Sequence, residues 1–161
     1  MVIIVMGVAG SGKTTIGQLL ARKFGWEFHD ADDLHPARNK EKMSQGIPLT
    51  DDDRGPWLQA VRDLVRQCLI ENRDTIIACS ALKQQYRDLL TSGSKEVSLV
   101  YLKGSQELIT KRLSARSGHF FNVKLLQSQF DSLEEPKEGI IVDISGTPES
   151  IVDEIRAKLN L

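Results

Sequence analysis

The sequence predicts a single α/β domain in which a parallel β-sheet is covered by helices on both faces. Strand-like apolar runs alternate with helical patterns along the whole chain, and this order builds parallel sheets. The first run, residues 1–6, is continuously apolar and is typical of a strand buried on both faces. The length of 161 residues suits one hydrophobic core, and neither a repeat nor a linker divides the chain.

Apolar periodicity, glycine and proline set the expected boundaries of the elements. We expect five strands, over residues 1–6, 26–28, 75–79, 96–102 and 139–144. We expect helices over residues 13–24, 37–45, 56–72, 82–90, 106–114, 124–133 and 148–159. Gly25 follows the first helix as a terminating glycine, and Pro56 suits the first turn of the long third helix.

The composition indicates an ordinary globular protein. Its 21 basic side chains face 22 acidic ones, so we expect neither nucleic acid nor a membrane as a partner. No apolar run reaches the ~20 residues of a membrane span, and a strand from Met1 leaves no room for a targeting peptide. Cys68 and Cys79 lack metal-ligand spacing, and we expect two reduced core thiols in a cytoplasmic protein.

A glycine-rich segment between a predicted strand and a predicted helix matches G-x-x-x-x-G-K-[ST] without a mismatch. Its glycines let backbone N–H groups turn towards phosphate oxygens, and the following helix directs its positive dipole end there. Lys13 would reach the β- and γ-phosphates, and the Thr14 hydroxyl would ligate Mg²⁺. The alternative is a glycine-rich turn with a chance Lys-Thr pair. We expect an ATP site made by Gly7, Val8, Ala9, Gly10, Ser11, Gly12, Lys13, Thr14 and Thr15.

Acidic residues follow the second predicted strand. Ligands of an open parallel sheet collect beyond the carboxyl ends of its strands, so these acids should share a crevice with the phosphate loop. Asp30 and Asp32 are two apart and would point the same way in extended chain. We assign Asp30 to Mg²⁺ and Asp32 to the acceptor hydroxyl. The alternative is that the acids cap the next helix and face water, with Asp33 as the expected cap.

Basic residues indicate an acidic acceptor. Arg54, Lys83 and Arg87 leave the same predicted sheet edge. His35 and Arg38 belong to a segment that should cover this edge. An arginine can bind a carboxylate or a phosphate through two hydrogen bonds. We expect these five side chains to contact the acceptor, although simple exposure to solvent is the alternative for each alone.

Longer motifs surround these residues. Residues 30–36 read DADDLHP, residues 46–54 read GIPLTDDDR and residues 56–58 read PWL. ACSALK at 78–83 is followed by YR at 86–87, and GHF at 118–120 is followed by LLQSQF at 125–130. Together these motifs resemble the gluconate kinase family, from Val5 to about Pro136.

The resemblance implies ATP- and Mg²⁺-dependent phosphorylation of D-gluconate at its 6-hydroxyl. It also implies a fold similar to that of shikimate and nucleoside-monophosphate kinases and, often, a homodimer. His119 joins the acceptor-binding residues on the same ground. After the GHF triplet the family usually has Met and a proline-containing pair, where this chain has Phe121, Asn122 and Val123. The order of the lid segment is therefore open.

Two arginines precede this segment. Arg112 and Arg116 lie four apart on one helical face, as in the lid of small kinases. We expect a mobile lid over residues 114–123 that brings both arginines to the transferring phosphate. A solvated helix face is the alternative. Together with Lys13 and Asp32 these arginines are the expected catalytic residues, and residues 145–148 would lie beside the adenine.

Three other functions compete with this interpretation. A kinase of another small hydroxy acid, such as shikimate, would use the same phosphate loop. A GTPase-like switch would need an Asn-Lys-x-Asp guanine reader at a strand end, whereas Asn39-Lys40 falls in a helical stretch. A nucleic-acid-dependent ATPase would need a basic, aromatic-interleaved surface, which the composition does not indicate.

Overall fold

The structure is a computed structural model that describes residues 1–115 and 123–161, and this part of the chain forms one five-stranded parallel sheet. The strands lie in the order β2-β3-β1-β4-β5. Their bounds are β1 (Val2–Met6), β2 (Glu27–Asp30), β3 (Thr75–Ala78), β4 (Val97–Lys103) and β5 (Ile140–Asp143). The predicted fold class is confirmed.

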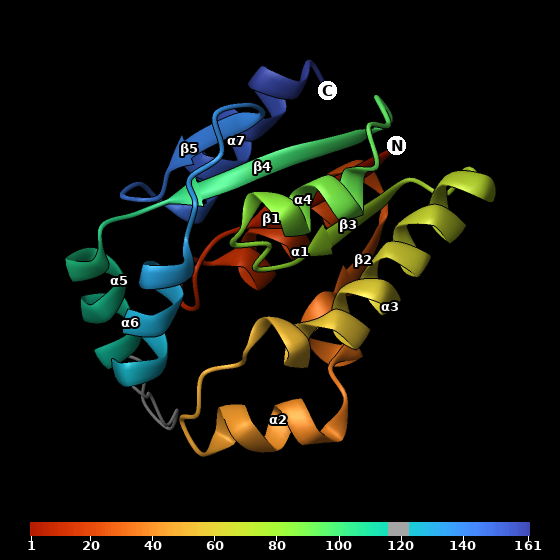
Figure 1. Cartoon of the computed structure of the whole chain (residues 1–161). Helices are drawn as coiled ribbons and strands as arrows, with labels where there is room; N and C mark the ends of the chain where they lie inside the picture. The colour runs from red at the N-terminus through yellow and green to blue at the C-terminus, as the bar shows by residue number, and fades with distance from the viewer. Residues whose placement is uncertain (116–122) are drawn as a thin grey trace.

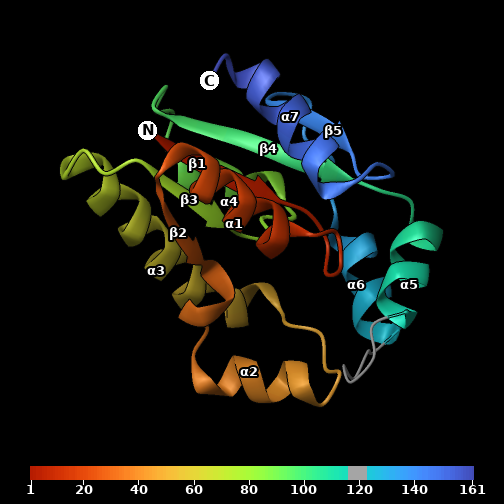
Figure 2. The same cartoon turned by 180° about the vertical axis from the view of Figure 1, so that it is seen from behind.

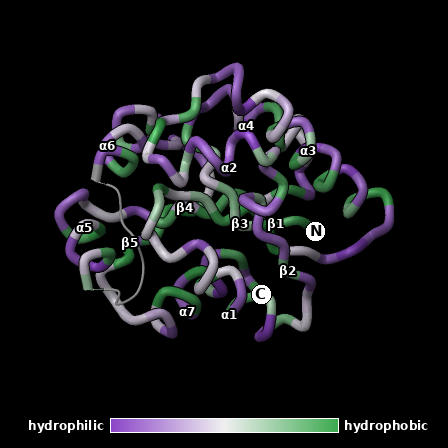
Figure 3. Tube along the Cα trace, turned by 90° about the horizontal axis from the view of Figure 1, so that it is seen from below, coloured by the Kyte–Doolittle hydropathy of each residue, from purple (hydrophilic) through white to green (hydrophobic). Residues whose placement is uncertain are grey.

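Helices cover both faces of the sheet (Figure 1). One face carries α3 (Asp51–Ile70) and α4 (Gln84–Thr91), which pack on each other. The other face carries α1 (Lys13–Phe24) and α7 (Pro148–Leu159), which are seen in front of the strands in Figure 2. Figure 3 looks along these layers and shows the helices above and below the strands.

Further helices lie beyond the carboxyl ends of the strands. These are α2 (Ala37–Ser44), α5 (Gln106–Ser114) and α6 (Val123–Ser132). The last two lie side by side, whereas α2 lies below β2 in Figure 1. Among the described residues, no helix is long and apolar enough to cross a membrane.

The central strand β1 divides the hydrophobic core into two clusters. Its side chains alternate, so that Ile3 and Val5 pack towards α1 and α7 while Val2, Ile4 and Met6 pack towards α3 and α4. All five are at most 1% exposed. Each such side chain stabilises the fold by about 1.5–3 kcal/mol through burial. The phosphate loop therefore starts from a firmly anchored strand.

The long helix α3 begins at Asp51, earlier than the expected start near Pro56. Thr50 Oγ1 accepts a hydrogen bond from the Asp53 N–H at 3.1 Å, and an Asp53 carboxylate oxygen accepts from the Thr50 N–H at 3.0 Å. This reciprocal cap fixes the helix start. Pro56 lies inside the helix, where its missing N–H removes one backbone bond near the amino end. The segment with the expected acceptor-binding arginine is therefore the first turn of a long helix.

The other boundaries differ from those expected by two residues or fewer. The helix α4 begins at Gln84 because Lys83 is extended, with a φ of −102° and a ψ of 147°. Lys83 consequently precedes the first turn of α4, at the end of the loop that leaves β3. Gly25 ends α1 with a φ of 70°, as expected.

Candidate active site

The phosphate loop joins β1 to α1 and requires glycine at two positions. Gly10 and Gly12 have φ angles of 79° and 97°, in the left-handed region that favours glycine. A Cβ on Gly10 would also lie 2.5 Å from Leu113, so α5 packs closely on the loop. Ser11 is 2% exposed, and its hydroxyl has no hydrogen-bond partner among the described residues. This loop, with a helix amino end behind it, fits a polyphosphate chain.

Two side chains hold the Val8–Ala9 peptide unit of this loop. Lys13 Nζ donates to the Val8 carbonyl at 3.0 Å, and the Ala9 N–H donates to Gln129 Oε1 at 2.6 Å. Gln129 comes from α6, so the loop contacts both α5 and α6. Burial lowers the pKa of Lys13, while nearby Asp32 opposes this shift. The ammonium group and the carboxylate therefore lie close enough for their charges to interact.

The two expected Mg²⁺ ligands lie together at the start of α1. Thr14 Oγ1 donates to Asp30 Oδ2 at 2.9 Å, and a hollow of about 390 Å³ opens beside them. Hydroxyl and carboxylate oxygens are the ligand type that Mg²⁺ prefers, and its nucleotide sites add phosphates and water. The described residues hold no group of three or more His, Cys, Asp or Glu that could bind a metal by themselves. Thr14 and Asp30 thus fit a metal that is shared with phosphate.

The acidic cluster does not continue as extended chain, contrary to the expectation. A 3₁₀ turn, η1 (Ala31–Leu34), follows β2. Asp30 caps this turn by accepting a hydrogen bond from the Asp32 N–H at 2.9 Å. Asp30, and not Asp33, is therefore the cap, and the same carboxylate also binds Thr14.

Asp32 lies in η1, with one side exposed to solvent and protein on its other sides. The surrounding protein excludes water and raises the pKa of its carboxyl above the ordinary value, while Lys13 lowers it in part. A carboxylate with a raised pKa is a better proton acceptor at neutral pH. The geometry therefore suits a base that lies beside a phosphate-binding lysine.

His35 is buried next to this acidic turn, just before α2 rather than on it. Its ring stacks on Trp57 with 4.3 Å between the centroids. Its Nδ1 lies 3.2 Å from the Asn39 amide nitrogen, which donates, so Nε2 carries the proton. Burial, and then the charges of Arg54 and Lys40, lower the pKa of His35 to about 4. The side chain is therefore a neutral hydrogen-bond donor at neutral pH.

The cationic side chains of the acceptor side gather around one tyrosine. Arg54 Nη1 donates to the Tyr86 hydroxyl at 3.1 Å, and the Arg54 and Lys83 charges lie 5.7 Å and 5.8 Å from the ring centre. Lys83 Nζ donates to both carboxylate oxygens of Asp51, at 2.9 Å and 3.2 Å, and the Tyr86 hydroxyl donates to Asp51 as well. Hydrogen bonds from Tyr86 and then from Lys83 lower the pKa of Asp51.

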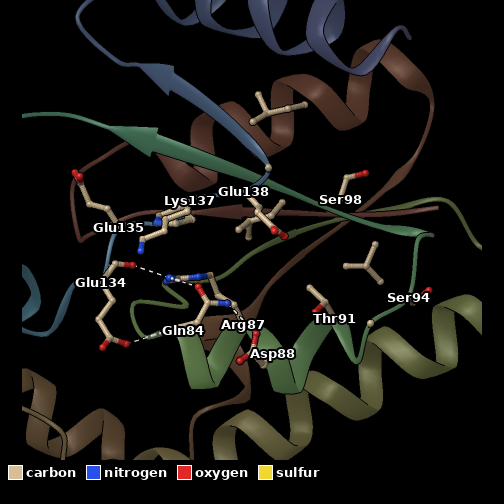
Figure 4. A pocket seen from close by; sticks show the side chains of 16 residues that line it. Gln84, Arg87, Asp88, Thr91, Ser94, Ser98, Glu134, Glu135, Lys137 and Glu138 are labelled. Carbon is tan, nitrogen blue, oxygen red and sulfur yellow. Dashed lines mark hydrogen bonds between the residues drawn. The ribbon is translucent and has the colours of Figure 1, made fainter.

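Arg87 lies elsewhere, which contradicts the expected acceptor contact. Its side chain is 3% exposed and donates to the carbonyls of Ala81, Leu82 and Glu134 at 2.6–3.0 Å. Figure 4 shows it between α4 and the segment after α6, in a pocket of about 970 Å³ that borders the beginnings of β4 and β5. The phosphate loop follows the carboxyl end of β1, at the edge of the sheet opposite to this pocket. Arg87 therefore fastens the segment after α6 to α4.

For the remaining expected site residues, the structure gives fewer contacts or none. Arg38 is 67% exposed on α2 and lies 3.8 Å from Asp53. Arg112 is partly buried in the last turn of α5. Hydrogen bonds from Ser145 lower the pKa of Asp143, and the charge of Arg112 adds to this effect, so Arg112 lies near the expected adenine loop. Arg116, His119 and most of the expected lid lie outside the described residues.

The sequence motifs contained three further residues whose contacts were not foreseen. Asp51 and Tyr86 bond to each other and, respectively, to Lys83 and Arg54 across 32 to 35 residues of chain, which helical spacing does not predict. Gln129 had no local signal either, because it contacts Ala9 across 120 residues of chain. Cys68 and Cys79 are both buried and free, as expected.

The chain resembles known kinases along its length. The family model described as Shikimate kinase matches residues 9–160. The thermosensitive gluconokinase of Escherichia coli (strain K12) is 51% identical over 83% of this chain and 72% of its own. The thermoresistant gluconokinase of the same organism is 46% identical over 92% of this chain and 87% of its own.

A solved structure agrees with these sequence relatives. The crystal structure of a gluconokinase from Sinorhizobium meliloti 1021 has a TM-score of 0.89 and 41% identity, covering 98% of this chain and 90% of that chain. The resemblance carried by the motifs is thereby confirmed. The chain belongs to the gluconokinase family, within the wider group that the Shikimate kinase family model describes.

Proposed function

We propose that this protein transfers the γ-phosphoryl group of ATP to the 6-hydroxyl of D-gluconate, giving 6-phospho-D-gluconate and ADP. The observation that carries the proposal is that groups suited to three chemical functions lie beyond the carboxyl ends of neighbouring strands, at one edge of the sheet. A glycine loop with Lys13 fits a polyphosphate, Asp32 is a carboxylate with a raised pKa, and Arg54 belongs to a cationic group suited to a sugar acid. Membership of the gluconokinase family supports the choice of acceptor.

On the nucleotide side, the chain's own groups bind and orient the phosphates. The loop amides and Lys13 would gather the charge that develops on the transferring group. Lys13 must exchange its bond to the Val8 carbonyl for phosphate oxygens. Thr14 and Asp30 would hold Mg²⁺, which when bound neutralises part of the phosphate charge. Arg112 and Arg116 would complete the site as the lid closes.

On the acceptor side, Asp32 would orient the 6-hydroxyl and accept its proton as the new O–P bond forms. Arg54 and Lys83 would bind the carboxylate at the other end of the sugar acid. His35 would donate its Nε2 proton to a hydroxyl group without adding charge. Arg38 and His119 complete the proposed acceptor set. Positioning both substrates in line provides much of the rate enhancement.

The wider setting belongs to the same proposal. We treat residues 1–161 as one kinase domain with a lid over about 114–123, and a homodimer in the cytoplasm as its working form. The two free buried cysteines support a reducing compartment. The balanced charge supports a small-molecule acceptor rather than nucleic acid or a membrane surface.

An ADP-release assay with a panel of acceptors tests this proposal. Gluconate should give the highest kcat/KM, with other six-carbon aldonic acids lower and glucose, which lacks the carboxylate, near background. Shikimate is the informative competitor, because a kinase of another hydroxy acid would use the same loop. The relatives do not favour it. A higher kcat/KM for shikimate than for gluconate would overturn the proposal.

A further inference from the structure

Asp51, the first residue of α3, fills a carboxylate-binding site. Its two oxygens accept from Lys83 Nζ at 2.9 Å and 3.2 Å, and one of them also accepts from the Tyr86 hydroxyl. Arg54, three residues further along α3, donates to the same hydroxyl at 3.1 Å. Lysine, tyrosine and arginine together are a typical receptor for a carboxylate. Here a carboxylate of the chain itself occupies it.

The neighbouring Asp53 is a carboxylate of the same helix that is buried and held by several hydrogen bonds, and it serves as a comparison for Asp51. Asp53 has a side chain only 7% exposed, and it is held by the Thr50 N–H at 3.0 Å and by Lys42 at 2.9 Å and 3.0 Å. Those bonds close the helix cap and the contact with α2. Asp51, by contrast, has a side chain 54% exposed and bonds to Lys83 and Tyr86 at the start of α4. An exposed ion pair is weak, so another anion can replace it.

We propose that Asp51 is a specificity-determining residue, whose carboxylate occupies the site of Lys83 and Tyr86 until the carboxylate of the acceptor replaces it. The inference rests on the proposed function, which assigns Arg54 and Lys83 to the acceptor carboxylate. When a sugar acid binds, its carboxylate replaces that of Asp51, so Lys83 stays paired with an anion. A neutral sugar gains none of these bonds, because the site is already filled. Asp51 thus lowers the affinity for neutral acceptors relative to that for sugar acids.

This exchange has a measurable consequence for affinity. The acceptor binds fully only to the fraction of molecules in which Asp51 has left the site, so the apparent affinity is reduced by that fraction. Removing the charge of Asp51 should therefore strengthen gluconate binding. The opposite model is a brace, in which Asp51 holds Lys83 and Tyr86 in position for the acceptor. Loss of a brace would weaken gluconate binding, so the sign of the change separates the two models.

The test uses Asp51→Asn, which keeps the size and removes the charge. We expect the KM for gluconate to fall by roughly 3- to 20-fold, with a much smaller change in kcat and in the KM for ATP. Asp52→Asn is the matched control, because Asp52 is exposed in the same helical turn and also carries one negative charge. It should change the KM for gluconate by less than about 2-fold, as is usual for an exposed site. A raised KM for gluconate in Asp51→Asn overturns the inference.

A double-mutant cycle separates this inference from the proposed function. Lys83→Met keeps the apolar stem and should raise the KM for gluconate by roughly tenfold or more, as for a lost charge-assisted hydrogen bond. In that background Asp51→Asn should change KM by less than about 2-fold, since the shared partner has gone. If Lys83→Met leaves the KM for gluconate unchanged, the assignment of the carboxylate site fails. If Lys83→Met raises KM but the gain from Asp51→Asn persists in full, only the exchange with Asp51 fails.

Discussion

The phosphate loop and the acceptor side, meaning the residues proposed to bind the acceptor, lie at the same edge of the sheet, yet they are built in different ways. The loop is a single segment of eight residues, and its shape comes from backbone angles at Gly10 and Gly12. The acceptor side takes side chains from η1, from the segment before α2, from the start of α3 and from the start of α4. Its geometry therefore depends on contacts between segments far apart in the chain.

This difference affects how each side responds to change. The loop depends on the strand β1, which lies in the middle of the core, so exchange of one side chain in the crevice should leave the loop folded. On the acceptor side Arg54, Tyr86, Lys83 and Asp51 share hydrogen bonds, so removal of one member changes the others. We expect substitutions on the first side to act on turnover and those on the second to act mainly on acceptor affinity.

The largest effect should come from Asp32→Asn, where the two sides meet. We expect kcat to fall by about 10²- to 10⁴-fold, the usual contribution of a positioned base. In the unaltered protein the ionised form of Asp32 should be active, and its pKa is raised above 3.8. Activity should therefore fall as the pH drops through this raised pKa, earlier than for an ordinary aspartate. Steady-state kinetics against pH check both points.

Asp33→Asn is the control for this substitution, because Asp33 is exposed in the same turn. It should keep kcat within about threefold, as expected for an exposed surface position. A kcat for Asp32→Asn within tenfold of the unaltered protein would contradict the assignment of the base.

Lys13→Ala tests the loop alone. Turnover should fall by about 10²- to 10³-fold, the scale of one lost charge-stabilising contact. Lys13 also lowers the pKa of Asp32 in the folded protein, so the acid limb of the pH profile should move to higher pH. Thermal denaturation should show a folded protein. The control is Lys23→Ala at the other end of α1, which removes an exposed ion pair with Asp153 and should keep its activity. Near-normal turnover in Lys13→Ala would refute the role of Lys13 in phosphoryl transfer.

The same contrast explains which parts could be predicted from the sequence. The strands, most helix boundaries and the phosphate loop depend on local patterns, namely apolar runs, glycines and a contiguous motif. The predicted start of α3, near Pro56, was wrong, because the capping box of Thr50 and Asp53 begins the helix before the proline. It could have been found, since Thr50 and Asp53 stand at the spacing that such a cap requires.

Side-chain partners across long stretches of chain could not be predicted in this way. Arg87 looked like a free cation beside the crevice, but its partner Glu134 lies 47 residues further along the chain. Nothing in the local pattern distinguishes an arginine that binds backbone carbonyls from one that binds a ligand. The pairing of Asp51 with Tyr86 crosses 35 residues for the same reason. The Asp51–Tyr86 contact follows from the packing of α3 on α4, and the Arg87–Glu134 contact from the position of the segment after α6 beside α4.

Arg54→Ala should act on one substrate only. The loss of a charge-assisted hydrogen bond costs about 1.5–3 kcal/mol, so the KM for gluconate should rise by about 10- to 150-fold. The KM for ATP should change by less than about twofold, because the loop takes its shape from its own backbone. Arg66→Ala, exposed on the same helix, is the matched control. An equal rise in the KM for both substrates would mean that Arg54 also contacts the nucleotide, and the expected difference between the two sides of the site would not hold.

The smallest effect concerns a contact through which the loop also depends on a distant side chain. Gln129 Oε1 accepts from the Ala9 N–H at 2.6 Å, so a phosphate oxygen that accepts from this N–H must replace Gln129. Gln129→Ala removes this competitor and should lower the Kd for a non-hydrolysable ATP analogue by about 2- to 5-fold, the scale of one neutral hydrogen bond. Gln127→Ala on the same helix loses a bond to Asp131 at 2.8 Å and one from Gln106 of α5 at 2.5 Å, neither of them to the loop, and should leave the Kd unchanged. Calorimetric titration measures both values. A higher Kd in Gln129→Ala would mean that this side chain supports the nucleotide, and the loop would then resemble the acceptor side in depending on a contact made across the fold.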